Sequence, residues 1–313
     1  MTTLLLSHPA CLRHDMGPGH PERPDRLRAV AAALAAPEFA SLVREEAPLG
    51  ADDVIRLAHP EAYIQAIREA APTEEGEIVG LDADTAMSAG SLEAALRAVG
   101  AATRAVDQVM AGAVSNAFLA VRTPGHHAEP LRPMGFCLFS TAAIAALYAR
   151  KQHGAKRVAL VDFDVHHGNG SQAVLWNERD IFFASSHQMP LYPGTGAVTE
   201  TGAHDTIVNA PLRAGDGGAA FRAAWETRIL PALDAFGFDL LLISAGFDAH
   251  EDDPLANLRL HEDDFAWITR ALVERADRHC GGRVVSFLEG GYDLDALARS
   301  VAAHVGVLKE AQA

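Results

Sequence analysis

The sequence has few cysteines, few lysines and few aromatic residues, and each shortage excludes a class of protein. Its three cysteines, Cys11, Cys137 and Cys280, lie far apart and form no CxxC pair, so neither a disulfide scaffold nor a cysteine-rich zinc module is indicated. Lysine occurs only three times, and 41 acidic against 26 basic residues give a net charge of −15. Because nucleic acids and anionic membranes bind cationic surfaces, this composition argues against both as partners.

Long apolar runs are also missing. No stretch approaches the roughly 20 apolar residues of a membrane span, and the N-terminal sequence lacks the basic segment of a signal peptide. The chain is nevertheless long enough for a sizeable core, with 313 residues of which 49% are hydrophobic. We therefore expect a cytoplasmic protein with a single domain over residues 1–313. The sequence assigns no oligomeric state.

Short apolar runs alternate with helical patterns along most of the chain. Buried strands are expected within 117–121, 157–165, 182–185, 240–245 and 284–288. Helices are expected at 88–110, 140–153, 219–236 and 263–279. The polar segment 71–80 is expected to be a surface loop. This alternation predicts an α/β fold in which a mostly parallel sheet is flanked by helices.

The residues at the ends of four of these runs are types that bind metals or transfer protons. In chain order they are His126 and His127, then Asp162, Asp164 and His166, then Asp248, and finally Tyr292. Ligands bind outside the carboxyl ends of the strands in open parallel sheets. We therefore expect these side chains to meet at one edge of the sheet.

The Asp-x-Asp-x-His segment is the strongest local indication of a metal. Its alternating side chains, Asp162, Asp164 and His166, share one face of an extended chain. Burying two carboxylates with an imidazole is unfavourable unless a cation neutralises them. Asp164 and His166, with Asp248 from another run, are therefore a candidate catalytic metal site with an open coordination position. The alternative is a hydrogen-bonded polar cluster that caps the strand ends, and this segment alone does not distinguish the two.

The ordered motifs resemble those of the metal-dependent histone deacetylase superfamily, which includes bacterial deacetylase-like amidohydrolases and acetylpolyamine amidohydrolases. The matching segments are Gly19-His-Pro-Glu-Arg-Pro-Asp-Arg-Leu27, Pro124-Gly-His-His-Ala128, Gly135-Phe-Cys, Asp162-Phe-Asp-Val-His-His-Gly-Asn-Gly170, Ser185-Ser-His, Pro193-Gly-Thr-Gly196, Ala245-Gly-Phe-Asp248 and Glu289-Gly-Gly-Tyr292. They extend over nearly the whole chain, and the opening segment and Asn169 are similar to the class II branch. The resemblance implies the single-domain arginase/deacetylase α/β fold.

The resemblance also implies a metal and its ligands. Zn²⁺ would be bound by Asp164, His166 and Asp248, with Fe²⁺ as the alternative. A K⁺ site is implied as well; it would use the backbone carbonyls of Asp162, Asp164, His166 and Ser186 and the hydroxyl of Ser185.

Catalytic and substrate-binding roles follow from the same resemblance. His127 would be the general base and then the general acid. His126, paired with Asp162, would act mainly through its charge, and Tyr292 would donate a hydrogen bond to the oxyanion. Substrate would be bound by the Gly135 carbonyl, by Phe136 and Tyr192, and beside Leu255 and Gly290. We further expect His126 to be an imidazolium because it faces anionic Asp162. His127 would face neutral Asn169 and remain a base near neutral pH.

Three functions are consistent with these residues. The first is a zinc-dependent deacylase acting on acyl-lysine in proteins or peptides, and the second is hydrolysis of acetylated polyamines by the same groups. Polyamine-specific relatives can carry glutamate where this chain has Leu255, so leucine favours acyl-lysine, whereas the acidic net charge favours a cationic polyamine. The third, a non-catalytic acyl-lysine-binding module, is disfavoured because Tyr292 is present.

Other polar residues are given ordinary structural interpretations. His59, His153, His204, His279 and His304 are expected at the surface or at caps. The acidic segment Glu251-Asp252-Asp253 is expected to be a solvated loop, with attraction of cationic substrates as the alternative.

Overall fold

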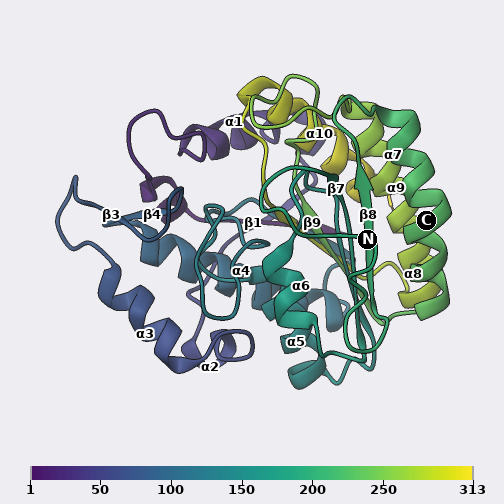
Figure 1. The fold of residues 1–313 in the computed structure, drawn as a ribbon, viewed down its shortest axis with the longest axis horizontal. Helices are drawn as coiled ribbons and strands as arrows, with labels where there is room; N and C mark the ends of the chain where they lie inside the picture. The colour runs from purple at the N-terminus through teal and green to yellow at the C-terminus, as the bar shows by residue number, and fades with distance from the viewer. Residues whose placement is uncertain (1, 312–313) are drawn as a thin grey trace.

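The computed structural model describes residues 2–311, in which eight strands form one parallel sheet (Figure 1). The strand order is β2-β1-β5-β10-β9-β6-β7-β8. The strands are β1 Thr3–Ser7, β2 Val43–Glu46, β5 Asn116–Leu119, β6 Val158–Asp162, β7 Ile181–Gln188, β8 Ile207–Leu212, β9 Leu240–Ala245 and β10 Val284–Leu288. A separate antiparallel pair, β3 (Ile78–Gly80) and β4 (Ala86–Ser88), lies away from this sheet.

Helices cover both faces of the sheet. They are α1 Asp25–Ala33, α2 Asp52–Ile55, α3 Glu61–Ala70, α4 Ser91–Met110, α5 Thr141–His153, α6 Asn169–Leu175, α7 Gly218–Ala224, α8 Leu230–Phe236, α9 Glu262–Cys280 and α10 Leu294–Glu310. In Figure 1, α4, α5 and α6 lie on one side of the sheet, and α7, α8, α9 and α10 lie on the other. Within residues 2–311, no helix combines the length and apolar character needed to cross a bilayer.

The central strands are buried along their whole length because helices cover both of their faces. Every residue of β6, β9 and β10 is buried, and most are Val, Leu or Ile, as expected of a parallel sheet. The register aligns their polar ends: Asp162 at the end of β6 is paired with Ser185 of β7 and with Ser244 of β9. The apolar strands thus carry polar side chains to one level of the sheet, where the site lies.

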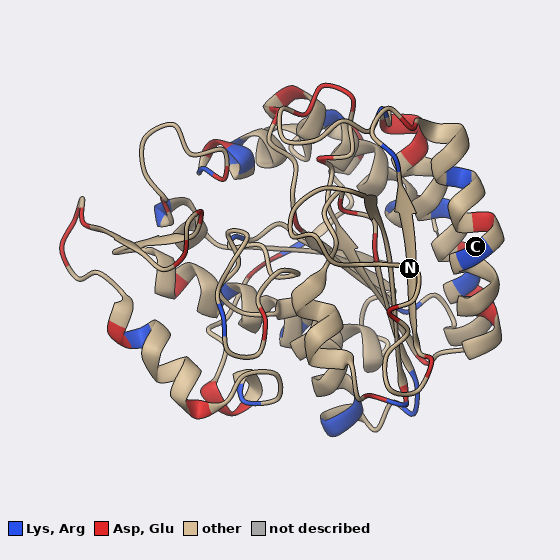
Figure 2. Cartoon of the chain, viewed as in Figure 1, with Lys and Arg blue, Asp and Glu red and all other residues tan. Residues whose placement is uncertain are grey.

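The predicted fold class is confirmed, and the main differences are local. The expected helix 219–236 is divided into α7 and α8 by a π-helical turn, Trp225–Ile229, and Pro231, which lacks an N–H, follows this interruption of the regular helix. The expected loop 71–80 ends in the short strand β3. Strand β2, whose sequence is Val-Arg-Glu-Glu, gave no apolar signal because it is a mostly exposed edge strand. Figure 2 shows the basic residues distributed over many separate helices and loops.

Candidate functional site

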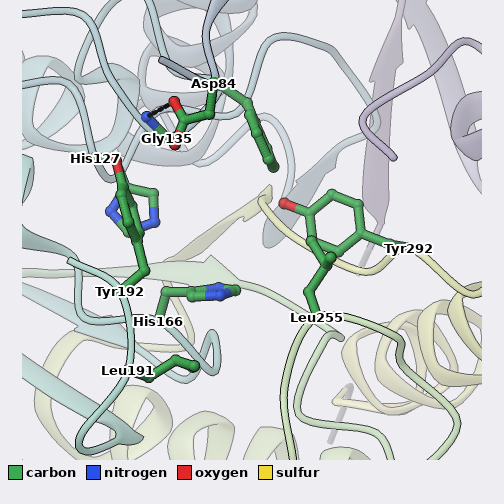
Figure 3. Close-up of a pocket in the computed structure, with 9 residues that line it drawn as sticks. Asp84, His127, Gly135, His166, Leu191, Tyr192, Leu255 and Tyr292 are labelled. Carbon is green, nitrogen blue, oxygen red and sulfur yellow. Dashed lines mark hydrogen bonds between the residues drawn. The ribbon is translucent and has the colours of Figure 1, made fainter. Parts of the chain in front are cut away.

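The predicted site residues meet at the carboxyl ends of β5, β6, β9 and β10. They surround a pocket of about 220 Å³ (Figure 3). Its lining residues are Asp84, His127, Gly135, Phe136, His166, Leu191, Tyr192, Leu255 and Tyr292. In Figure 3 the Tyr292 hydroxyl points towards the centre of the pocket, across from His127 and Tyr192.

Asp164, His166 and Asp248 are buried together, and His166 also lines this pocket. Nδ1 of His166 lies 3.2 Å from Oδ1 of Asp164 and 3.1 Å from Oδ2 of Asp248. One ligand atom from each residue falls within 4.8 Å of the other two. Backbone N–H groups orient the carboxylates, since Gly290 donates to Asp164 at 2.9 Å and Val165 donates to Asp248 at 2.9 Å.

The surroundings of these three side chains fit a cation. Burial, and then the neighbouring Asp164 carboxylate, raise the pKa of Asp248 to about 7, so the protein atoms alone do not fully compensate both negative charges. A divalent cation would provide the missing positive charge. The chain also keeps this space open, because a Cβ on Gly290 would collide with both carboxylates and a Cβ on Gly246 with that of Asp164.

The two adjacent histidines have different partners. Nδ1 of His126 lies 3.0 Å from Oδ2 of Asp162, and Nδ1 of His127 lies 2.7 Å from Oδ1 of Asn169. Burial alone would lower the pKa of His126. The negative charges of Asp164 and Asp162 outweigh this effect and raise the pKa well above its usual value. Burial, and then the adjacent His126 charge, hold the pKa of His127 well below its usual value. The pair is therefore divided into a charged and a neutral imidazole.

Glu129 fixes which atom of Asn169 faces His127. The Asn169 amide Nδ2 donates to Oε1 of Glu129 at 2.8 Å, which directs Oδ1 of Asn169 towards His127. Nδ1 of His127 must then be the donor of that pair, and its Nε2 keeps a free lone pair. Sequence reasoning missed Glu129, although it directly follows the matched segment that ends at Ala128.

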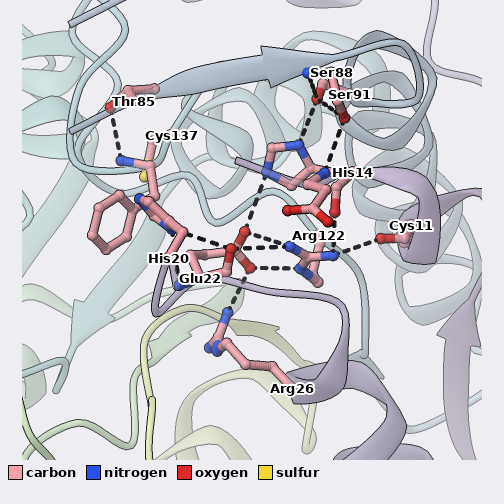
Figure 4. Close-up of polar contacts among 12 residues, drawn as sticks. Cys11, His14, His20, Glu22, Arg26, Thr85, Ser88, Ser91, Arg122 and Cys137 are labelled. Carbon is pink, nitrogen blue, oxygen red and sulfur yellow. Dashed lines mark hydrogen bonds and ion pairs between the residues drawn. The ribbon is translucent and has the colours of Figure 1, made fainter. Parts of the chain in front are cut away.

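The opening motif supplies a buried ionic network behind Tyr292 (Figure 4). Glu22 pairs with Arg26, whose Nη1 lies 3.0 Å from its Oε1, and with Arg122, whose Nη2 lies 2.6 Å from its Oε2. Nε of Arg26 also donates to the carbonyl of Gly291 at 2.6 Å. Sequence reasoning assigned no role to Glu22 or Arg26, although their i, i+4 spacing was a signal for such a pair.

The predicted substrate-binding residues are close to His127 and Tyr292. Gly135 adopts φ +55°, and a Cβ there would collide with the His127 ring. Phe136 has φ 68°, which is uncommon for a residue with a side chain, and its ring lies 5.8 Å from that of Tyr292, edge to face. Asp84, which sequence reasoning missed, accepts the Gly135 N–H at 3.2 Å and so faces the pocket from the β3–β4 connection.

Of the residues predicted for K⁺, Asp162 ends β6, Ser185 and Ser186 lie in the adjacent strand β7, and Asp164 and His166 follow β6. Asp162 of β6 is paired with Ser185 of β7, so these positions are neighbours in the sheet. The Ser185 hydroxyl lies 2.9 Å from Nδ1 of His187, and the Ser186 hydroxyl accepts from Nε1 of Trp225 at 3.0 Å.

Two histidines expected at the surface are buried instead. His59 is 1% exposed and accepts the Ser140 N–H at 2.9 Å. His304 is 0% exposed and lies between the hydroxyls of Thr269 and Ser286, at 2.6 and 2.8 Å. These interpretations were wrong because the partners, backbone groups of Pro130 and Ser140 for His59 and hydroxyls for His304, are distant in sequence and meet these histidines only in the folded chain.

Comparisons with known proteins identify the family of the chain. The histone deacetylase domain family matches residues 20–308. A histone deacetylase-like amidohydrolase of Pseudomonas aeruginosa is 37% identical, over 88% of this chain and 73% of its own. A probable deacetylase of Archaeoglobus fulgidus is 36% identical, over 94% and 82%. The crystal structure of the HDA15 HD domain aligns with a TM-score of 0.92 at 34% identity, over 99% and 89%.

The sheet carries histidine, carboxylate and tyrosine side chains at one edge. Together with the deacetylase and amidohydrolase relatives, this arrangement supports a hydrolase. The chain belongs to the histone deacetylase family. Its membership supports deacetylase activity.

Proposed function

We propose that this chain is a zinc-dependent amidohydrolase that removes acetyl or other acyl groups from the side-chain amine of lysine in proteins or peptides. The observation that carries the proposal is the buried cluster of Asp164, His166 and Asp248 beside His127 and Tyr292. Its two carboxylates and one imidazole suit Zn²⁺ and leave a coordination position for substrate, and Fe²⁺ is the alternative metal.

Amide hydrolysis needs an activated water, a polarised carbonyl and a proton for the leaving amine. A divalent cation held by the three side chains would act as a Lewis acid on the carbonyl and would acidify water. The two carboxylate ligands formally cancel the charge of such a cation. The protein must therefore provide its own base and its own donor to the developing oxyanion.

His127, His126 and Tyr292 meet these needs. The free Nε2 of His127 takes a proton from the attacking water and then gives it to the leaving amine. The positive charge of His126, held by Asp162, favours negative charge developing nearby. The Tyr292 hydroxyl stays protonated because burial raises its pKa well above the usual value, and it donates to the oxyanion.

The pocket walls suit the aliphatic stem of lysine. Phe136, Tyr192 and Leu255 line it, and Leu191 adds a further apolar surface. The alternative substrate, an acetylated polyamine, is favoured by Asp84, which also lines the pocket, and by the net charge of −15. K⁺ bound near Asp162 and Ser185 and a cytoplasmic location remain predictions.

The test is a side-by-side measurement of kcat/KM on an acetyl-lysine peptide, acetylputrescine and acetylspermidine. We expect the peptide to be hydrolysed fastest, and Leu255→Glu to shift the preference towards the polyamines, with Leu255→Gln as the uncharged control. Faster hydrolysis of a polyamine by the wild-type chain would contradict the lysine assignment. Binding of the peptide with no turnover would instead identify a non-catalytic module.

A further inference from the structure

Asp253, in the loop that follows β9, is a buried acidic residue to which the proposed reaction assigns no role. It is 6% exposed. Its neighbours Glu251 and Asp252 are exposed, as expected of a solvated loop, but for Asp253 that expectation was wrong. Burying a carboxylate is unfavourable unless polar partners compensate it. The partners of Asp253 therefore show what the loop needs an acidic residue for.

These partners are backbone N–H groups of two separate segments. Oδ2 of Asp253 accepts the N–H of Tyr292 at 2.7 Å and that of Asp293 at 3.4 Å. Oδ1 accepts the N–H of Leu255 at 3.0 Å. Asp293 is the N-cap of α10, so the positive end of this helix also favours the Asp253 anion. One carboxylate thus joins the loop after β9 to the segment after β10.

Both joined segments reach the pocket. Tyr292 and Leu255 line it, and in Figure 3 they lie on the same side of it, across from His127. Two glycines, Gly290 and Gly291, precede the tyrosine, and Gly291 adopts φ +124°. Because glycine leaves the backbone conformationally free, this segment does not fix the tyrosine by itself. An acceptor from another part of the chain is needed.

The peptide group between Gly291 and Tyr292 is held at both ends by buried charged side chains. Its carbonyl accepts from Nε of Arg26 at 2.6 Å, and its N–H donates to Oδ2 of Asp253 at 2.7 Å. Hydrogen bonds in which one partner is charged are stronger than those between neutral groups. The orientation of this peptide plane sets the direction in which the Tyr292 side chain leaves the backbone.

We propose that Asp253 is a positioning residue that fixes Tyr292 and Leu255 relative to each other at the pocket. The inference rests on the proposed function, because Asp253 would act on hydrolysis through the Tyr292 hydroxyl. Asp253 itself does not line the pocket. Displacing a catalytic group by about 1 Å can lower a rate by roughly 100-fold, so a link behind the tyrosine affects the reaction without contact to substrate.

A carboxylate suits this role because it has two acceptor oxygens and carries no N–H. In Asp253→Asn one oxygen remains, but the new amide group turns an N–H towards another backbone donor. Asp253→Asn should therefore lose one of the two links, and Asp253→Ala should lose both. Asp252→Ala is the matched control, since it removes an exposed carboxylate from the adjacent position, where its partner is Arg299.

The test of the link to Tyr292 is a double-mutant cycle on kcat. We expect Asp253→Ala to lower the kcat of the wild-type chain about tenfold. It should lower that of Tyr292→Phe less than about twofold, because the hydroxyl through which Asp253 acts is already absent. Asp253→Asn should lie between Asp253→Ala and wild type, and Asp252→Ala should match wild type. Equal fold losses in both backgrounds would overturn the role of Asp253, since a general loosening of the fold affects both alike.

The link to Leu255 is tested on KM in the same way. Asp253→Ala should raise the KM of the wild-type chain for its acylated substrate several-fold, because the leucine that contacts the substrate stem is no longer held. In Leu255→Ala the same substitution should leave KM unchanged. A KM that does not change in the wild-type background would overturn this second link.

Amide hydrogen exchange tests the links without relying on hydrolysis. Buried, hydrogen-bonded N–H groups exchange slowly. The N–H of Tyr292 should be protected in wild type and in Asp252→Ala, and should lose protection in Asp253→Ala. Fast exchange at Tyr292 in the wild-type chain would overturn the proposal even if Asp253→Ala fails to fold. A wild-type chain that shows this protection but hydrolyses neither peptide nor polyamine would instead contradict the proposed function and leave the link between Asp253 and Tyr292 standing.

Discussion

Arg26 lies against the ring of Tyr292, with its Cζ 5.0 Å from the ring centroid. Its Nε donates to the carbonyl of Gly291, the residue before Tyr292. Nη1 of Arg26 in turn donates to Oε1 of Glu22 at 3.0 Å. The opening motif of the chain thus supports the tyrosine that follows the last strand, and the two are joined through a fully buried ionic network.

Breaking this network should destabilise the fold. Glu22→Gln leaves Arg26 and Arg122 buried without their counter-charge, and the loss of one partner of a buried ion pair costs about 3–5 kcal/mol. Urea unfolding at pH 7 measures this loss. Glu61→Gln, which removes an exposed partner of Arg56, is the control and should leave the unfolding midpoint nearly unchanged. Similar midpoints for both variants would contradict the structural role of Glu22.

Tyr292→Phe should lower kcat about 100-fold with little change in KM. The hydroxyl is assigned to the oxyanion, which exists only near the transition state, and removing one such donor typically has an effect of this size. Steady-state kinetics on an acetyl-lysine peptide measures the effects on kcat and KM separately. A loss confined to KM would show that Tyr292 binds substrate and does not stabilise the oxyanion.

Moving the Glu129 charge next to His127 should shift the pH–rate profile. In the double variant Asn169→Asp with Glu129→Gln, the carboxylate introduced at position 169 lies beside Nδ1 of His127. The second substitution removes the Glu129 carboxylate, which would otherwise repel it. An adjacent anion raises the pKa of an imidazole, so the base stays protonated to higher pH. The acidic limb of kcat/KM should therefore move upward, by about one pH unit. An unmoved limb would reject His127 as the base.

Buried neutral histidines should make the fold sensitive to acid. Burial lowers the pKa of His304 to about 3, against 6.5 for an exposed histidine. A depressed folded pKa means that stability is fully present above pH 6.5 and is lost as the pH falls towards 3. This group alone accounts for a loss of about 2 kcal/mol between pH 7 and pH 5.

The variant His304→Gln removes this titration while keeping polar partners for Thr269 and Ser286. Its unfolding free energy should fall less than that of wild type between pH 7 and pH 5. His204→Gln, at an exposed position, is the control. An identical fall in all three proteins would show that His304 does not contribute.

The central part of the fold was predictable because its signals are local. Strands β9 and β10 have the predicted bounds, since an uninterrupted apolar run specifies a strand buried on both faces. The polar residues after these strands also follow from sequence, because parallel strands bring their carboxyl ends to one edge. Asp164 and Asp248 could therefore be expected to meet although they lie 84 positions apart in the chain.

The remaining features depend on contacts that no local pattern encodes. Glu129 orients Asn169 across 40 positions of the chain. Asp84 reaches the pocket from a hairpin outside the main sheet, and Arg26 reaches Gly291 from the opposite end of the chain. Each residue is polar and, taken alone in the sequence, indistinguishable from a solvated side chain. Only the folded arrangement shows what each one contacts.

The most direct measurement is peptide deacetylation by the wild-type protein before and after dialysis against a chelator, followed by addition of Zn²⁺. Its activity reports on a cation held by Asp164, His166 and Asp248. We predict that chelation abolishes hydrolysis and that Zn²⁺ restores it, with no restoration in Asp248→Asn. Hydrolysis that continues at its original rate in the metal-free protein would contradict the proposed mechanism.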